Sequence, residues 1–468
     1  MALIGIDIGS SFIKGSLLDL DRRVLTHVRH VPFPPPLQGL SPGHREYDPR
    51  HVVDAVRSLI DGLMAASTDT VDGLIMCSQM HGLVLTTKRG EPRSNLITWQ
   101  DQRTLQPHPA GQGTYFDVMA QRVNPTQVRQ LGNELDPGRP VSFLFWLAEQ
   151  GLLTDPSLIP ASLPDFVLAN FCQTQPVTDS TNAAAHGAFN LETGDWHSEV
   201  LASLGLDRLR WPELVPHGVV VGTLKLGGRG VPCYTPIGDS QCALLGALLD
   251  YGELSLNVAT GAQVSLLRPH LEFGDFQTRP YFDGGCLTTI PNVPAGRSLT
   301  ALVRLLSELA EAQGIALPDP WAYIAQAAAA VAPPNLRVDL AFFRSSCGDQ
   351  GSITVMREEE LTVGHLFRAS FQNMADNFWM SARRLSPEQD WQRLVFSGGL
   401  VQRFPVLRTL ICDTFGVGHR ISPTSTVLRV MDRVRPNGFG QILDERVRLE
   451  PQPLEQLQCV VGALRVIV

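Results

Sequence analysis

The first thirty residues alternate between apolar and small or polar side chains. Ile4, Ile6 and Ile8 are separated by single small or acidic residues, which is the period of a strand with one apolar face. We predict three successive strands, over residues 4–8, 12–18 and 24–31. The proline-rich run 32–36 ends this meander, because proline cannot extend a central strand.

Residues 48–66 have the spacing of an amphipathic helix. The apolar positions that share one face of this helix are Val52, Val56, Leu59, Ile60 and Leu63. The apolar run 71–76 predicts a buried strand, and residues 79–82 form the turn after it. Alternation of strands and helices in this order predicts α/β layers.

A second strand–turn–strand pattern lies about 250 residues downstream, over residues 253–264. Its turn also consists of small residues, which indicates a duplicated architecture with one such turn in each half. Residues 299–313 and 360–384 have helical patterns. Pro232 and Pro236 break the pattern between the halves, so we predict an N-terminal domain over residues 1–235 and a C-terminal domain over residues 236–468.

Length and composition limit the class of protein. A chain of 468 residues with 44% hydrophobic residues is long enough for two or three domains with real cores. Its net charge of −8 and its lack of a dense basic run argue against a nucleic-acid or anionic-membrane partner. No apolar run reaches the roughly 18 residues of a membrane span, and the N-terminus lacks the pattern of a signal peptide.

The eight cysteines are scattered and include no C-x-x-C pair. This spacing suggests neither a zinc site nor a disulfide framework. We therefore expect free thiols and a cytoplasmic location.

The segment from Asp7 to Gly15 is the first candidate for chemistry. Alternation places Asp7 on the face opposite the isoleucines, and Gly9 allows a ligand to approach the backbone closely. The N–H groups of such a turn can hold an anion, and a neighbouring carboxylate suits a magnesium ion bound through water. On this segment alone, an ordinary hairpin turn is the favoured interpretation. The turn Thr260-Gly261 is its counterpart in the second half, and no Walker A sequence is present.

Asp239 precedes a helix rich in alanine, leucine and glycine. At a helix N-terminus the dipole favours an ionised carboxylate, which suits a general base that accepts a hydroxyl proton. Aspartate is also a frequent N-cap, and spacing alone does not separate the two roles.

Residues 99–103 place an indole beside amide, acidic and guanidinium groups, a mixture that suits a polyol site. For each residue singly, a surface ion pair is the simpler explanation. His81, in the turn 79–82, would add a polar contact.

Residues 396–402 have the pattern of a strand that runs through the turn Gly398-Gly399 into a helix. The two glycines allow a flat ring such as adenine to approach the backbone, and a tight structural turn explains them equally well.

Taken in order, these segments resemble the FGGY family of carbohydrate kinases, over residues 1 to about 416. The stretches Thr178-Asp179-Ser180-Thr181-Asn182-Ala183 and Asp195-Trp196 resemble the mid-domain signature of that family. The resemblance implies the two-domain actin/hexokinase-like (ribonuclease H-like) ATPase fold, with its active site in the cleft between domains. It also implies the substrates ATP and a small sugar, and a requirement for Mg²⁺.

The resemblance assigns roles to residues of this chain. Asp239 would be the catalytic base, and Asp7 would organise magnesium through water, with Asp239 as a second candidate ligand. The nucleotide-binding set would be Asp7, Gly9, Ser10, Ser11, Lys14, Thr260, Gly261, Gly398, Gly399 and Gln402. The sugar-binding set would be Gln79, His81, Trp99, Asp101 and Arg103.

Within the family, three stretches are most similar to sedoheptulokinase: residues 98–103, 143–147 and 279–284. They imply phosphorylation of the primary hydroxyl of a ketose, with sedoheptulose giving sedoheptulose 7-phosphate. A pentulose kinase acting on xylulose or ribulose is the alternative, because one more hydroxymethyl changes only the depth of a pocket. A non-catalytic sugar-binding homologue is the second alternative.

The end of the chain departs from the family after about residue 417. Similar kinases continue into a short strand and an Ala/Gly-rich helix, whereas this chain continues with Ser422-Pro423-Thr424-Ser425-Thr426 and scattered arginines. We expect no such helix, and our hypothesis is a frameshifted or truncated C-terminus with an uncertain effect on ATP binding. The alternative is a genuine divergent tail that makes subunit contacts, as in a homodimer. An unchanged reading frame on resequencing would refute the frameshift.

Overall fold

The computed structural model describes residues 2–22, 24–66, 70–111, 113–422, 428–429, 446–449 and 458–467. The chain forms two compact units. Unit 1 comprises Met1–Leu248, Thr278–Gly285 and Pro423–Val468, and unit 2 comprises Leu249–Gln277 and Cys286–Ser422.

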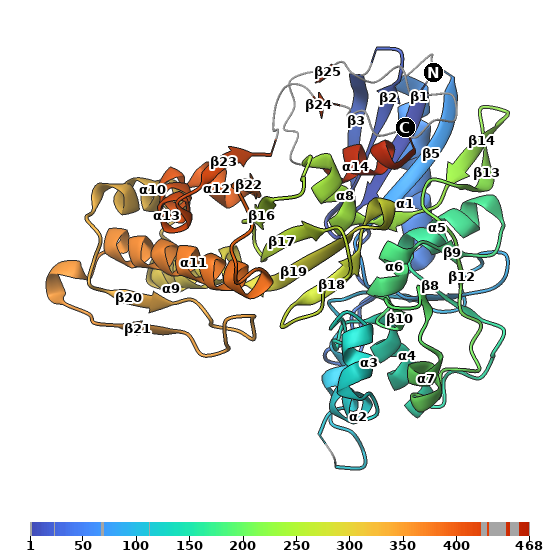
Figure 1. Cartoon of the computed structure of the whole chain (residues 1–468), viewed down its shortest axis with the longest axis horizontal. Helices are drawn as coiled ribbons and strands as arrows, with labels where there is room; N and C mark the ends of the chain where they lie inside the picture. Colours follow the sequence, from blue (N-terminus) through green and yellow to red (C-terminus); the bar gives the residue numbers. More distant parts are fainter. Residues whose placement is uncertain are drawn as a thin grey trace. The chain divides into compact units, whose positions relative to one another are not determined.

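The main sheet of unit 1 has the strand order β13-β14-β5-β1-β2-β3-β25-β24 in the described part of the chain, with β15 paired to β5 (Figure 1). Its strands are β1 (Ala2–Ile8), β2 (Phe12–Asp19), β3 (Val24–Pro32), β5 (Val71–Ser78), β13 (Val220–Leu226), β14 (Arg229–Tyr234), β15 (Ile237–Gly238), β24 (Leu428–Arg429) and β25 (Arg446–Leu449). The predicted meander is confirmed: β1, β2 and β3 pair antiparallel, and β5 then pairs parallel to β1.

Short strand pairs and helices complete unit 1. The pairs are β4 (Glu46–Tyr47) with β7 (Leu96–Ile97), β6 (Val84–Thr86) with β8 (Ile159–Ala161), β9 (Val177–Thr178) with β12 (Glu213–Leu214), and β10 (Phe189–Asn190) with β11 (Asp195–Trp196). The helices are α1 (Pro49–Ala66), α2 (Tyr115–Gln121), α3 (Pro125–Gln130), α4 (Pro140–Glu149), α5 (Leu163–Cys172), α6 (Ser180–Ala185), α7 (Ser198–Ser203), α8 (Asp239–Gly246) and α14 (Gln458–Ile467). Short 3₁₀ turns occur at Arg103–Leu105 and Phe282–Gly284, and a further strand, β18, spans Gln277–Pro280.

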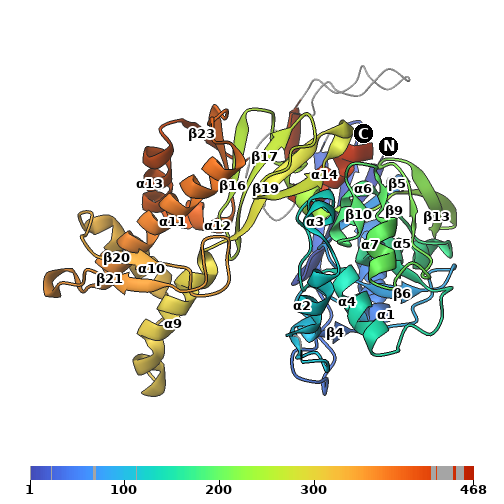
Figure 2. The same ribbon diagram turned by 60° about the horizontal axis from the view of Figure 1, so that its bottom comes forward.

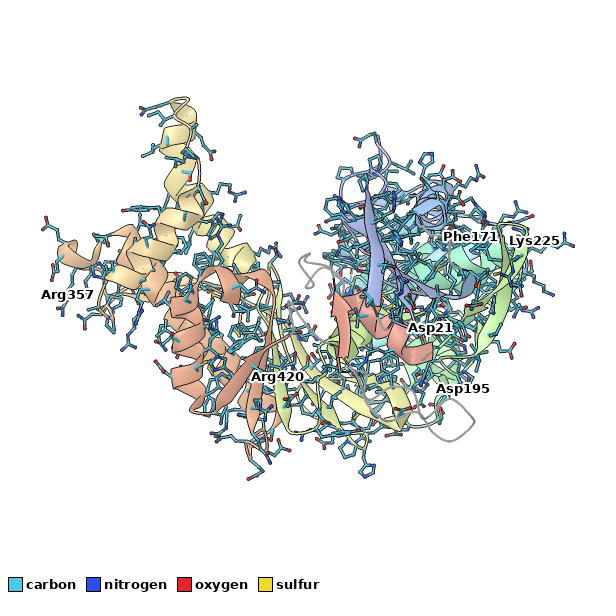
Figure 3. The ribbon with its side chains drawn as sticks, turned by 90° about the horizontal axis from the view of Figure 1, so that it is seen from above. Asp21, Phe171, Asp195, Lys225, Arg357 and Arg420 are labelled. Carbon is cyan, nitrogen blue, oxygen red and sulfur yellow. The ribbon has the colours of Figure 1, made fainter. Side chains whose placement is uncertain are left out.

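Unit 2 repeats the plan of the first sheet. Its strands β16 (Glu253–Asn257), β17 (Ala262–Arg268) and β19 (Cys286–Val293) pair antiparallel in sequence, and β22 (Arg393–Ser397) then pairs parallel to β16. β23 (Gly418–Ile421) adds a parallel edge, and Arg420 on it (labelled in Figure 3) forms an ion pair with Glu253 on β16. Figure 2 shows β16, β17 and β19 side by side. The same order of a three-stranded meander followed by a parallel strand in both units matches the duplicated architecture that the sequence predicts.

The other elements of unit 2 pack around this sheet. They are α9 (Gly296–Ala312), α10 (Pro320–Ala330), α11 (Val363–Leu385), α12 (Gly399–Arg403), α13 (Pro405–Phe415), the strand pair β20 (Arg337–Asp339) and β21 (Ser352–Thr354), and a 3₁₀ turn at Glu358–Glu360. The predicted helices at 299–313 and 360–384 correspond to α9 and α11. α11 contributes Phe367, Phe371, Met374 and Phe378 to the core of the unit.

The helix α1 shows why the apolar pattern leads to this packing. All five predicted positions on its apolar face are buried. Gly15 on β2 has no side chain, and a Cβ there would lie about 3 Å from the side chains of Leu59 and Leu63. The glycine therefore lets the helix lie close to the sheet. Burial of each large aliphatic side chain contributes about 1.5–3 kcal/mol.

The units divide at Leu248 and Leu249, later than the division between 235 and 236 that the prolines suggest. Pro236 interrupts the sheet only briefly, because the chain continues as β15 and pairs with β5 before it enters α8. α8 therefore belongs to unit 1. Two further segments, Thr278–Gly285 and Pro423–Val468, also cluster with unit 1 rather than with the second half of the sequence.

The expectation that the tail lacks a helix is wrong. Gln458–Ile467 form α14, which packs against α8, β1 and β5 of unit 1 (Figure 1). A Cβ at Gly462 would lie 1.9 Å from the carbonyl oxygen of Cys242, so the two helix backbones are in direct contact there. The segment is short and its glycine interrupts the apolar pattern, which hides the helix in the sequence. Of the residues on which the frameshift hypothesis depends, Arg429 lies on β24 and Arg446 and Arg448 lie on β25, while residues 423–427 and 430–445 lie outside the described residues.

Among the described residues, no helix combines the length and the apolar character needed to cross a membrane. The eight cysteines are free thiols, as their spacing indicates.

One buried carboxyl group in unit 1 predicts a pH-dependent stability. Burial, with a smaller contribution from the nearby Asp179 carboxylate, raises the pKa of Asp165 from 3.8 to about 8, although a hydrogen bond from Ser162 Oγ (2.6 Å) opposes the shift. Because the folded pKa lies above the unfolded one, the stabilisation is complete below about pH 4 and is lost as the pH rises through 8. We expect the Tm of the wild type to fall relative to that of Asp165→Asn between pH 5 and 9. Asp61→Asn, on the exposed face of α1, is the control. A constant difference between wild type and Asp165→Asn over this range would contradict the assignment.

Candidate active site

Three parallel strands of unit 1 end at the same edge of its sheet. In the register of β1, β5 and β15, Asp7 lies opposite Cys77, and Cys77 lies opposite Ile237. The backbone N–H of Gln79 donates to Ile8 O at 2.9 Å, which extends this alignment beyond the strands. Ligands of open α/β sheets bind at the carboxyl ends of parallel strands. The topology therefore brings Asp7, Gln79 and Asp239 to one edge from three distant parts of the chain.

The carboxylates of Asp7 and Asp239 influence one another. Burial raises the pKa of Asp7 to about 6, although the Lys14 ammonium, 3.9 Å from its Oδ2, opposes the shift. Burial raises the pKa of Asp239 to about 7, and the like charge of Asp7 adds to the shift. Neighbouring carboxylates with raised pKa values suit a divalent cation, which favours their ionised forms.

The residues present fit a cation bound mainly through water and phosphate. Among the described residues, no group of three or more histidine, cysteine, aspartate or glutamate side chains is arranged as a metal site. Two carboxylates with few other protein ligands match the pattern of magnesium bound together with a nucleotide, in which water and phosphate oxygens complete the coordination.

Asp239 does not cap its helix. Gly238 is the N-cap of α8 and Asp239 is the first helical residue, so the capping interpretation left open by the sequence does not hold. The backbone N–H of Ser240 bonds the Asp239 carboxylate and lowers its pKa against the effect of burial. The side chain is partly exposed, so a ligand can reach it.

The short strand β15, which leads into Asp239, is held by residues of the 178–183 stretch. Thr181 Oγ1 accepts a hydrogen bond from Gly238 N at 2.9 Å, and Asn182 Nδ2 donates to Pro236 O at 3.2 Å. Thr181 Oγ1 in turn donates to the carboxylate of Asp179, which caps α6. Their positioning role cannot be recognised from the motif itself, because the partner backbone lies more than fifty residues away.

Three thiols lie close to Asp7 and to the start of α8. Cys77 Sγ lies 3.9 Å from Asp7 Oδ1, and Cys459 Sγ lies 3.6 Å from the backbone carbonyl oxygen of Asp239. Burial raises the pKa of Cys77 and of Cys242, so these thiols stay protonated. They pack as small apolar side chains and leave the carboxylates as the charged groups of this edge.

The turn after β1, which the sequence predicts as an anion-binding loop, is closed by its own backbone. Gly9 N donates to Phe12 O at 3.1 Å, which closes the turn, and Ser10 and Ser11 are exposed. Lys14 lies directly opposite Asp7 in the β1–β2 pairing. The basic and acidic groups of the motif are therefore neighbours across the hairpin.

Three of the five predicted sugar-binding residues present polar groups near this edge. Trp99 Nε1 donates to Gln79 Oε1 at 3.2 Å, and the indole is 48% exposed. The buried Nε2 atoms of Gln79 and His81 have no hydrogen-bond partner among the described residues. Burial and the charges of Arg139 and Arg279 lower the pKa of His81 well below its usual value, so the ring is neutral. Met80 packs against Gly238 and links this turn to the start of α8.

Asp101 and Arg103, the other two predicted sugar-binding residues, belong to a buried hydrogen-bond network. Both are 2% exposed, and Arg103 forms hydrogen bonds with both carboxylate oxygens of Asp101 and with Glu46. Asp101 Oδ2 also accepts from Arg45 N. This buried network supports the loop of Trp99, and direct contact of these two residues with a sugar stays a prediction.

The predicted nucleotide turns of unit 2 lie beside each other. Leu400 N donates to Val258 O at 3.2 Å, and Val258 N donates to Ser397 O at 2.8 Å. Gly398 has a φ of +92°, and a Cβ there would lie 2.4 Å from Val258 O, so only glycine fits. Thr260, Gly261, Gly399 and Gln402 are exposed around these turns. The ends of β16 and β22 therefore form one open surface within the unit.

Comparisons with known proteins identify a family and similar proteins. Residues 2–246 match the model of the N-terminal domain of the FGGY family of carbohydrate kinases. Sedoheptulokinase of Mus musculus is 23% identical over 460 residues, covering 88% of this chain and 92% of that protein. Sedoheptulokinase of Homo sapiens is 24% identical over 414 residues, covering 80% and 82%. The solved structure of a ligand-bound xylulose kinase from Lactobacillus acidophilus has a TM-score of 0.77 at 18% identity, over 100% of this chain and 88% of that chain.

The bond from Gly238 to Thr181 generates a prediction about local stability. In Thr181→Val the buried N–H of Gly238 loses its acceptor, which costs roughly 1–3 kcal/mol. We expect a lower Tm and faster amide hydrogen exchange over residues 236–240. Thr181→Ser retains the hydroxyl and should exchange like the wild type. Equal exchange in all three proteins would show that Thr181 does not hold this strand.

Proposed function

Because the chain belongs to the FGGY family of carbohydrate kinases, we propose that it transfers the γ-phosphoryl group of ATP to the primary hydroxyl of a ketose. Sedoheptulose, giving sedoheptulose 7-phosphate, is the first candidate substrate. The observation that carries the proposal is the position of Asp239. A partly exposed carboxylate stands at the carboxyl ends of β1, β5 and β15, beside Asp7.

In this reaction Asp239 accepts the proton of the attacking hydroxyl. Phosphoryl transfer passes through a loose transition state, so positioning of the hydroxyl and neutralisation of charge matter more than strong deprotonation. A magnesium ion bound with ATP would supply that neutralisation. Asp7 would hold its water shell, and the turn from Gly9 to Lys14 would bind phosphate oxygens.

The sugar would lie along Gln79, His81 and Trp99. The two buried Nε2 atoms without partners supply hydrogen-bonding groups for hydroxyl oxygens, and the exposed indole supplies an apolar plane for C–H groups. The nucleotide would contact Thr260, Gly261, Gly398, Gly399 and Gln402 of unit 2.

Relatives support the choice of sugar. Two curated relatives that cover most of this chain are sedoheptulokinases. A similar solved structure is a xylulose kinase, so a pentulose kinase is the second candidate. The presence of both carboxylates at one edge of the sheet and of α14 disfavours the alternative of a non-catalytic sugar-binding protein.

A panel of ketoses with coupled detection of ADP tests the proposal. We expect the highest kcat/KM with sedoheptulose, while a higher value with D-xylulose or D-ribulose would establish the pentulose kinase. No ADP formation with any ketose, together with a sugar-dependent rise in Tm and no effect of ATP, would identify the binding protein instead.

Removal of the Asp239 carboxylate should abolish most turnover and leave the sugar bound. Loss of a general base lowers kcat by at least about 100-fold. We expect this loss in Asp239→Ala, with sugar-dependent thermal stabilisation retained. Asp61→Ala removes an exposed carboxylate from the same unit and serves as the control. Turnover near that of the wild type in Asp239→Ala would refute the assignment.

Truncation of Trp99 should weaken sugar binding selectively. The indole is exposed and bonded to Gln79, so its loss removes both an apolar plane and the partner that orients an amide. In Trp99→Ala we expect the KM of the sugar to rise more than the KM of ATP. Tyr323→Ala, an exposed aromatic of unit 2, is the control and should change neither. A larger rise for ATP would place Trp99 outside the sugar site.

A further inference from the structure

Two cysteines of unit 1 come from distant parts of the sequence and lie in the same part of the fold. Cys172 is the last residue of α5, and Cys233 lies on β14. The end of α5 packs against β13 (Figure 3, which labels Phe171 of α5 and Lys225 of β13). β13 pairs antiparallel with β14, and Gly222 lies directly opposite Cys233 in this pairing. One strand pairing therefore connects the two cysteines.

The glycine on β13 leaves the space that Cys172 fills. A Cβ at Gly222 would lie 2.6 Å from Cys172 Sγ and 2.8 Å from Cys172 Cβ, so a larger residue there would displace the thiol. Residues directly opposite each other in an antiparallel pair have their side chains on the same face of the sheet. Cys172 Sγ therefore takes the place of the missing side chain at Gly222, on the face to which the side chain of Cys233 points.

The two thiols are hydrogen-bonded to one another. Both belong to the apolar core that α1 and α5 form with the main sheet: Cys233 is fully buried, and Cys172 is half-buried at the edge of that core. Cys233 Sγ also donates to Val231 O at 3.6 Å. A small reagent can therefore reach Cys172 from solution, whereas Cys233 is covered.

The hydrogen bond between the thiols acts in opposite directions on their pKa values. It lowers the pKa of Cys172 more than burial raises it, and a bond from the backbone of Thr223 adds to the lowering. The same bond, together with burial, raises the pKa of Cys233. The pKa of each of the other six cysteines is raised as well. Cys172 is therefore the thiol of this chain that ionises most readily, and the thiolate is the form that reacts with oxidants.

We propose that Cys172 and Cys233 are a redox-reactive pair, in which a peroxide oxidises Cys172 and Cys233 then closes a reversible disulfide. A half-exposed thiol with a second thiol directly behind it is the arrangement of a reactive cysteine and its resolving cysteine. The chain continues from β14 into β15 and Asp239, so the disulfide ties the end of α5 to the strand that leads to the proposed base. The pair is separate from the residues assigned to ATP and sugar, so its oxidation does not depend on the proposed kinase reaction.

The chemistry balances with hydrogen peroxide as the only co-reactant. The Cys172 thiolate attacks one peroxide oxygen, the O–O bond breaks, and the leaving oxygen takes up the thiol proton and departs as water. Cys172 is then a sulfenic acid. The Cys233 sulfur attacks the Cys172 sulfur, the S–S bond forms, the S–O bond breaks, and the hydroxyl leaves with the Cys233 proton as a second water. Two electrons pass from the two thiols to the peroxide.

Peptide mapping of the oxidised full-length protein tests the proposal. The protein is treated with hydrogen peroxide, its remaining thiols are blocked with N-ethylmaleimide, and its peptides are identified by mass spectrometry without reduction. We expect a Cys172–Cys233 disulfide as the first product, with loss of two of the eight free thiols and their recovery in dithiothreitol. A first disulfide that joins other cysteines, such as Cys77 and Cys459, would overturn the proposal, as would a Cys172 that stays reduced.

Serine variants separate the roles of the two thiols. In Cys233→Ser the sulfenic acid on Cys172 has no resolving partner, so dimedone should label Cys172 in this variant and much less in the wild type. Cys172→Ser should give neither the label at this position nor the disulfide. Cys347→Ser removes a half-buried thiol of unit 2 and, as the control, should oxidise like the wild type. Equal dimedone labelling of Cys172 in the wild type and in Cys233→Ser would refute the resolving role of Cys233.

Alkylation of the wild type gives a measurement that does not depend on the folding of a variant. Iodoacetamide reacts with thiolates, so at neutral pH it should modify Cys172 before the half-buried Cys347 and Cys412. Prior treatment with peroxide should abolish the labelling of Cys172, and dithiothreitol should restore it. Slower alkylation of Cys172 than of Cys347, or labelling that peroxide leaves unchanged, would contradict the assignment.

Discussion

The parallel pairing of β15 with β5 is the contact on which the site depends. β15 contains only two residues, yet its register against β5 sets the position at which the chain enters α8. Asp239 is the first residue of that helix, so a shift of this short strand would move its carboxylate away from Asp7. The bonds from Thr181 and Asn182 to the same short segment secure the register from the other side. Two strand residues alone could not hold it, because each backbone hydrogen bond contributes only about 1 kcal/mol.

The electrostatics of Asp7 and Asp239 explain why this edge of the sheet suits the proposed reaction. They also explain why burial of the two carboxylates opposes folding. Burial raises the pKa of Asp7 to about 6 and that of Asp239 to about 7, and the like charge of Asp7 adds to the shift of Asp239, so Asp239 is the carboxyl group that stays substantially protonated near neutral pH. In the proposed reaction, a cation that arrives with the nucleotide would favour the ionised forms and so would couple the charge state of the proposed base to nucleotide binding. The thiols that lie close to Asp7 and to the start of α8 stay protonated and add no competing charge. Lys14 supplies the opposing positive charge across the hairpin.

Local patterns in the sequence predict the meander and first helix of unit 1 and the hairpin and two long helices of unit 2. The period-two alternation of residues 4–8 and the apolar face of residues 48–66 lead directly to β1 and α1, because burial of those faces drives both elements. A buried network in which Glu134 forms ion pairs with Arg139 and Arg279 could not be predicted in this way. Its members are as many as 145 residues apart, and each charged residue in isolation resembles a solvated surface group. The helix α14 was missed for a related reason. It is held by contacts between the end of the chain and its beginning, which no local pattern records.

The close contact of α14 with α8 has a consequence for how the protein is made. α14 buries Val460, Val461 and Leu464 against elements that are synthesised more than two hundred residues earlier. During translation, β1, β5 and α8 emerge from the ribosome long before the residues that cover them. Unit 1 therefore reaches its final packing only after residues 458–467 have left the ribosome, and until then it exposes apolar surface to chaperones and to other nascent chains.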